Sequence, residues 1–142
     1  MVINGISVYP GHPCPHSTGS GCNDYEHRPV DPCHNFYCGW VIPNSPLPEW
    51  MKPNNGKVIV LFSKLAWNGV PVDLAVPMGK KIPPRSLEWL KKFSKENARP
   101  LIYSEQLIEN NEFQKQQQIH AYGPPAFQED MMRKMREEGK LW

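Results

Sequence analysis

The chain has 142 residues, a mass of 16.3 kDa and a formal net charge of +2. This length suits one domain, and a charge so near zero excludes a strongly basic nucleic-acid binder or an acidic tail. No apolar run reaches the roughly eighteen residues of a membrane span, and no secretory signal is recognisable at the start. We therefore expect an intracellular protein without a transmembrane segment, in a virion, the host cytoplasm or an organelle.

Composition divides the chain near residue 56. Residues 1–56 contain nine of the sixteen prolines, all four cysteines and four of the five histidines, but only six charged residues. Apart from a short strand within residues 2–9, this composition predicts little regular structure before residue 56. We expect a loop-rich module over residues 1–56, a small α+β body over residues 57–122 and a helical tail over residues 123–142.

The four cysteines of the first module are Cys14, Cys22, Cys33 and Cys38. Their spacing is C-x7-C-x10-C-x4-C, with His16, His27 and His34 interspersed. Zinc prefers four thiolate or imidazole ligands, and a segment poor in apolar residues can fold around such a metal. The pattern therefore predicts a structural zinc site on the four cysteines, in which one of the three histidines can replace a cysteine.

Three alternatives remain open for the same residues. The first is a pair of disulfides, Cys14–Cys22 and Cys33–Cys38, in an oxidising compartment. The second is four free thiols. The third is a small metal-dependent hydrolase or nuclease that uses histidines and acidic residues of the segment 12–38, although no H-E-x-x-H or deaminase pattern occurs there.

The body is predicted to begin with a β-hairpin over residues 57–76. Residues 57–62 form a β-branched, nearly continuous apolar run, and Asn68-Gly69 is a strong signal for a two-residue turn. Pro71 in the returning strand predicts an edge position or a late start. The Pro83-Pro84 pair then opens a helix that ends near Asn97.

The remainder of the body is predicted to hold one short strand and one weak helix. Residues 101–103 give the strand, and Ser104 is expected to cap a helix that ends before Gly123-Pro124. The predicted apolar face of this helix is irregular, with Leu107, Ile108 and Phe113.

The tail is predicted to form a last helix over residues 126–138. Phe127, Met131 and Met135 recur at spacings of four, and Gly139 suits the residue after a helix. Glu129–Arg133 and Asp130–Lys134 are spaced for ion pairs along the helix. This apolar stripe can fold back on the chain's own core, or dock with Trp142 into a groove of another protein.

Taken together, these features predict a non-enzymatic α+β accessory subunit of a larger protein assembly. A structural zinc site would hold its first module, and the C-terminal helix would bind other protein subunits. No clear nucleic-acid-binding patch is present, because the basic clusters are mixed with acidic residues.

Overall fold

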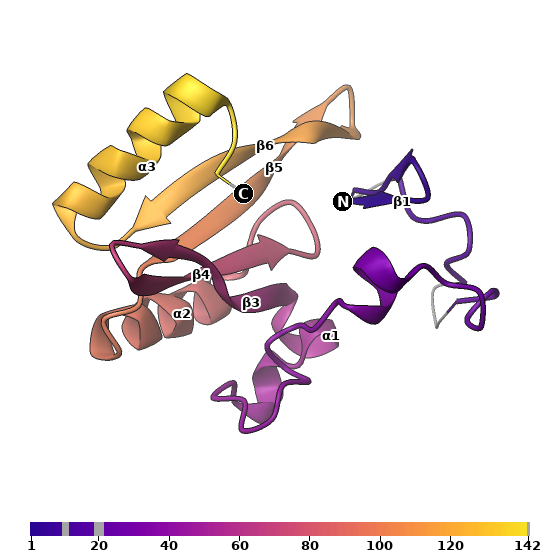
Figure 1. Ribbon diagram of the computed structural model, residues 1–142, viewed down its shortest axis with the longest axis horizontal. Coiled ribbons are helices and arrows are strands. Elements are labelled where there is room, and N and C mark those ends of the chain that lie inside the picture. Colours follow the sequence, from indigo (N-terminus) through magenta and orange to yellow (C-terminus); the bar gives the residue numbers. More distant parts are fainter. Residues whose placement is uncertain (10–11, 19–21, 142) are drawn as a thin grey trace.

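The computed structural model describes residues 1–9, 12–18 and 22–141. The chain is mixed α+β, as predicted, and its centre is a four-stranded sheet in the order β3–β4–β5–β6. The strands are β3 (Val58–Trp67), β4 (Val70–Pro77), β5 (Leu101–Glu109) and β6 (Glu112–Tyr122). Two helices cover the sheet, α2 (Pro84–Glu96) and α3 (Pro125–Glu138), and the N-terminal residues run along one side (Figure 1).

The two helices lie on opposite faces of the sheet, and each covers a separate core. Two neighbouring residues of β5 contribute to different cores: Leu101 packs on the α2 side with Leu90, and Ile102 packs on the α3 side with Phe127. Successive side chains of a strand point to opposite faces, so one short strand can serve both cores. All four of these side chains are at most 2% exposed.

The predicted hairpin over residues 57–76 is confirmed. β3 and β4 pair antiparallel around Asn68 and Gly69, whose φ angles of 49° and 79° are those of a type I′ turn. The predicted edge position of β4 is wrong, because β4 lies between β3 and β5. β5 pairs with β4 only over Asp73–Ala75, so Pro71 lies beyond the part of β4 that has neighbours on both sides.

The helix predicted from Pro84 is confirmed as α2, which ends at Glu96 with Asn97 as its C-cap. This helix carries the chain from β4 to β5 and makes that central pair of strands parallel. The last helix is confirmed as α3, and Gly139 follows it with a φ of 68°. Arg133 pairs with Asp130, at 2.7 Å, in place of the predicted Glu129.

The weak helix predicted after Ser104 is wrong. The residues instead form a long antiparallel hairpin, β5 and β6, whose turn is Asn110-Asn111 with φ angles of 51° and 63°. Two consecutive left-handed residues again make the type I′ turn, and asparagine tolerates this conformation better than most residues. Helix propensity of the glutamines in β6 is overridden by this pairing.

The described residues among the first 56 contain little regular structure, as predicted. In place of one strand over residues 2–9, β1 (Val2–Ile3) and β2 (Ile6–Ser7) form a small hairpin around Asn4-Gly5. Short helical segments follow: η1 (Val30–His34), η2 (Glu49–Met51) and α1 (Pro53–Gly56). Leu47 and Met51 enter the α2-side core. From here on we therefore divide the chain into an arm, residues 1–46, and a larger body, residues 47–141.

The C-terminal stripe lies on the chain's own sheet. Phe127 is fully buried, its ring meets that of Trp67 edge-on at 5.4 Å, and Met131 and Met135 pack beside it. Trp67 is held in turn by Asp130, to which its Nε1 donates at 2.8 Å. Trp142 lies outside the described residues. Within the described part of the chain, no helix is long and apolar enough to cross a membrane.

Candidate functional site

The arm is attached to the body at Gly39. The Gly39 N–H donates to the carbonyl of Val60 at 2.6 Å, which places the arm against the outer edge of β3. A Cβ atom at position 39 would lie 2.6 Å from the Phe62 ring, so a side chain here would displace the ring or the arm. Next to it, Trp40 packs against the α2-side core.

The four cysteines lie in two short segments of the arm. The Ser17 N–H donates to the Cys14 carbonyl at 2.9 Å, and Ser17 forms an antiparallel bridge with Cys22. Cys33 lies within η1, and Cys38 directly precedes Gly39. All four have free thiols, Cys22 is exposed, and the others are partly buried.

The histidines that we considered as replacement ligands are engaged in different ways. The His16 Nδ1 lies 3.0 Å from Asn23 Oδ1, and the His27 Nδ1 lies 2.7 Å from Asp24 Oδ1. His34 is exposed at the end of η1. Among residues 1–9, 12–18 and 22–141, no three histidine, cysteine or acidic side chains lie close enough together to hold a metal.

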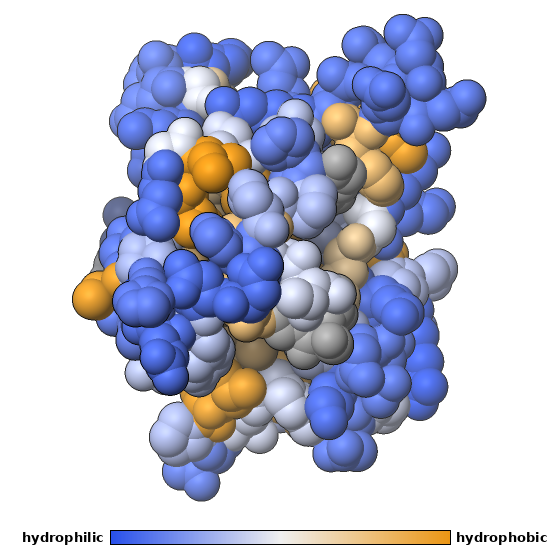
Figure 2. Space-filling view, turned by 90° about the vertical axis from the view of Figure 1, so that its right-hand side faces the viewer, coloured by the Kyte–Doolittle hydropathy of each residue, from blue (hydrophilic) through white to orange (hydrophobic). Residues whose placement is uncertain are grey.

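The arm exposes large apolar side chains and has almost no core. Gly39 is the one buried residue among the described positions of the arm. Eight of the twelve exposed large apolar side chains of the described chain belong to it: Met1, Val2, Ile6, Tyr25, Val30, Phe36, Tyr37 and Val41. Figure 2, which looks at the side where the arm lies in Figure 1, shows apolar areas between the hydrophilic ones.

A second group of polar residues lies on the α2 face of β5 and β6, and the sequence analysis did not identify it. The Tyr103 ring stacks on the His120 ring at 4.9 Å, and His120 Nε2 lies 3.7 Å from Glu105 Oε1. The Lys91 ammonium lies 5.6 Å from the Tyr103 ring and 5.3 Å from the Tyr122 ring. Cross-strand pairing of Tyr103 with His120 brings these residues together.

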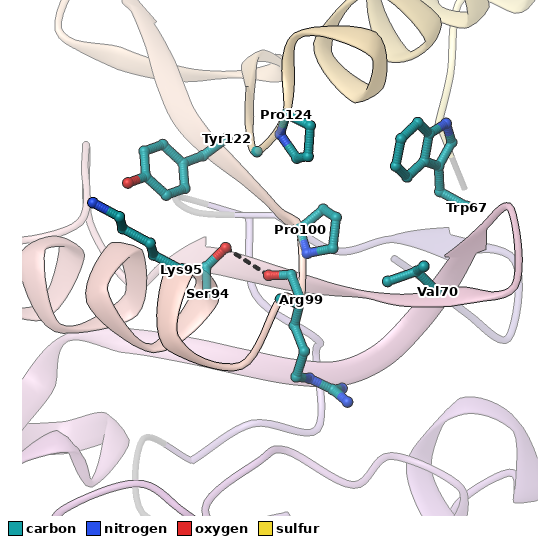
Figure 3. Close-up of a pocket in the computed structure, with 10 residues that line it drawn as sticks. Trp67, Val70, Ser94, Lys95, Arg99, Pro100, Tyr122 and Pro124 are labelled. Atoms are coloured by element: carbon teal, nitrogen blue, oxygen red, sulfur yellow. Dashed lines mark hydrogen bonds between the residues drawn. The ribbon is translucent and has the colours of Figure 1, made fainter.

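A pocket of about 520 Å³ opens beside Tyr122, where three connections of the fold meet (Figure 3). These connections are the β3–β4 turn, the segment between α2 and β5, and the segment between β6 and α3. Ten residues line the pocket: Trp67, Val70, Ser94, Lys95, Ala98, Arg99, Pro100, Tyr122, Gly123 and Pro124. The lining is mostly apolar, and neither Asp nor Glu belongs to it.

Hydrogen bonds hold the connections around the pocket. The Ser94 hydroxyl donates to the Arg99 carbonyl at 2.5 Å, and the Gln128 amide donates to the Gly123 carbonyl at 2.8 Å. The Arg99 side chain points away from the pocket in Figure 3 and binds Asp73. Two hydrogen bonds to Asp73 hold the Arg99 side chain in place, and they raise the pKa of its guanidinium.

The pocket could not be found from local motifs, because its residues come from segments far apart in the sequence. The available signals were the prolines Pro100 and Pro124 at the ends of predicted elements, and Gly123, where a Cβ atom would lie 2.9 Å from the Phe127 ring. No family model, curated protein or solved structure was found to match the chain.

Proposed function

We propose that the protein is a non-enzymatic subunit of a larger protein assembly, and that it binds its neighbour through the arm. The observation that carries this proposal is the concentration of exposed apolar side chains on a segment without a core. Val30 and Tyr37 are each 66% exposed and Tyr25 is 61% exposed. Exposed apolar surface of this kind marks protein interaction sites, where aromatic residues contribute much of the binding energy.

The low charge of the arm supports the same proposal. Its 46 residues include only four charged ones, Asp24, Glu26, Arg28 and Asp31. Segments that stay solvated and disordered are usually highly charged and poor in aromatic residues. The arm is rich in proline, but it has few charges and carries aromatic residues, so contact with another protein is a favourable way to remove its apolar side chains from water.

Zinc bound by Cys14, Cys22, Cys33 and Cys38 remains our proposal for what stabilises the arm before it meets its neighbour. The four thiols are free and none is fully buried. A metal would join Cys14 and Cys22 to the segment around η1, and such cross-links replace a core in small segments. When bound, zinc would supply structural cross-linking alone.

The interaction is tested by size-exclusion chromatography of the chain after expression in the organism that encodes it. We compare Val30→Ser/Tyr37→Ser with Leu107→Ser/Met132→Ser, a matched pair of exposed apolar positions on the body. The wild type and the body variant should elute in a large complex, and the arm variant should elute as a 16.3 kDa monomer. A wild-type monomer, or equal loss of the complex in both variants, contradicts the proposal.

Elemental mass spectrometry of protein purified without chelator tests the metal separately. About one zinc per chain with four titratable thiols supports the structural site. A metal-free chain with no titratable thiols would show that the arm is held by two disulfides and not by zinc. A metal-free chain with four thiols would leave the arm without a cross-link and would contradict this part of the proposal.

A further inference from the structure

We propose that the pocket beside Tyr122 binds a small aromatic anion, namely a planar ring that carries a carboxylate or a phosphate. All of the lining residues belong to the body. The proposal is therefore independent of the arm, and either one can fail without the other. The pocket has a volume of about 520 Å³, which lies within the range of pockets that enclose small organic ligands.

One end of the pocket is suited to an apolar ring. Figure 3 shows the indole of Trp67 and the side chain of Val70 at this end, with Pro100 and Pro124 between them and Tyr122. Trp67 cannot rotate freely, because its Nε1 is bound to Asp130 and its ring packs on Phe127. A fixed indole face and rigid proline rings give a planar ligand contacts on several sides.

The other end of the pocket carries positive charge. Lys95 and Tyr122 lie together there in Figure 3. Among the described residues, the Lys95 ammonium forms no ion pair, whereas Lys92, on the same helix, pairs with Glu96 at 3.9 Å. The Lys91 ammonium lies one turn away over the Tyr122 ring. With no acidic residue in the lining, this end attracts an anion.

Hydrogen bonds hold the walls of the pocket in place. Ser94 and Gln128 bind the backbone of two connections, and the Asp73 N–H donates to the Pro100 carbonyl at 2.9 Å. Gly123 lets Phe127 and Pro100 close behind the pocket. A preformed site binds more tightly, because ordering its walls takes no part of the binding free energy.

Fluorescence titration of the full chain with 8-anilinonaphthalene-1-sulfonate, an aromatic anion, tests the proposal. Beside weak binding to the exposed apolar side chains of the arm, we expect one tighter saturable site, with affinity about tenfold lower in Lys95→Met, because a hydrogen bond to a charged group is lost. Lys92→Met is the matched control, with the same charge change on the same helix, and should bind as the wild type does. N-phenyl-1-naphthylamine, which lacks the sulfonate, should bind both variants equally.

Equal affinity of the two lysine variants for the sulfonate would overturn the proposal, since the probe would then be bound elsewhere. Absence of binding at about 1 mM would do the same. Thermal melting of each variant confirms that the fold is intact. Displacement of the bound sulfonate by indole-3-acetate or by adenosine monophosphate distinguishes a carboxylate from a phosphate ligand, and failure of both contradicts the proposed ligand class.

Discussion

Arg99 binds Asp73 through two hydrogen bonds, from Nε to Oδ2 at 2.9 Å and from Nη2 to Oδ1 at 2.6 Å. The Asp73 side chain is 4% exposed and that of Arg99 is 23% exposed. The same carboxylate accepts the Ser63 N–H at 2.8 Å, where β3 bulges and Ser63 has a φ of 53°. One buried carboxylate thus joins β3, β4 and the segment before β5.

Asp73→Asn should therefore lower the free energy of unfolding by about 3 kcal/mol, because it leaves a partly buried guanidinium without its counter-ion. Urea denaturation measures this change. Glu96→Gln removes the carboxylate of the exposed Lys92 pair and should cost less than about 0.5 kcal/mol. Equal effects of the two substitutions would contradict this interpretation of the buried pair.

The pH dependence of this pair follows from Arg99. Its pKa is raised in the folded chain by hydrogen bonding to Asp73. A raised pKa means that the contribution of Arg99 to stability persists below its ordinary pKa and is lost only as the pH rises through the raised value. The difference in unfolding free energy between wild type and Asp73→Asn should thus be the same at about pH 7 and about pH 10.

Gly39→Ala should separate the arm from β3. The added Cβ would lie 2.6 Å from the Phe62 ring and 3.1 Å from the Val60 carbonyl oxygen, so the arm or the ring must move. We expect a loss of about 1–3 kcal/mol and faster proteolysis within residues 1–38. Gly79→Ala is the control, because a Cβ there meets nothing within 4 Å. Unchanged proteolysis in Gly39→Ala would mean that this contact does not hold the arm.

Phe127→Ala should lower the free energy of unfolding by about 3–5 kcal/mol, because it empties the centre of the α3-side core. Met132→Ala lies on the same helix at a position 61% exposed and should change stability by less than about 0.5 kcal/mol. Denaturant unfolding of both variants measures the difference. A small effect of Phe127→Ala would show that α3 does not depend on packing against its own sheet.

Asn111→Gly should preserve the β5–β6 hairpin, whereas Asn111→Ala should destabilise it by about 1–2 kcal/mol. Position 111 has a φ of 63°, which glycine adopts without strain and alanine does not. Amide hydrogen exchange near Glu109 and Glu112 reports the change locally. Similar exchange in the two variants would indicate that the turn conformation does not determine the pairing.

The sequence predicted those parts of the fold that local chemistry determines. Asn68-Gly69 marked the first hairpin, and prolines and a glycine marked the limits of α2 and α3. The same rule, applied to Asn4-Gly5 and Asn110-Asn111, would also have found the other two hairpins. The β5–β6 hairpin was missed because the glutamines of β6 favour a helix, and cross-strand pairing outweighs that propensity.

The candidate sites depend on contacts between distant segments and could be predicted only in part. Composition divided the chain near residue 56, yet it could not show that the residues before this point would expose Val30 and Tyr37. To predict the pocket, one would have to know that β4 and β5 are parallel neighbours, because this arrangement places the β3–β4 turn beside the segment that precedes β5. No local pattern contains that information.

The central strand pair of the sheet is much shorter than the pairs on either side of it. Only Asp73–Leu101, Leu74–Ile102 and Ala75–Tyr103 pair across β4 and β5, whereas each hairpin pairs along most of its length. The sheet thus consists of two firm halves that meet along a narrow seam. The residues of this seam are nevertheless among the most buried of the sheet, at positions 72–75 and at Leu101 and Ile102. Their backbone amides should exchange last, after the outer ends of both hairpins have opened, so the molecule would hold longest at its middle.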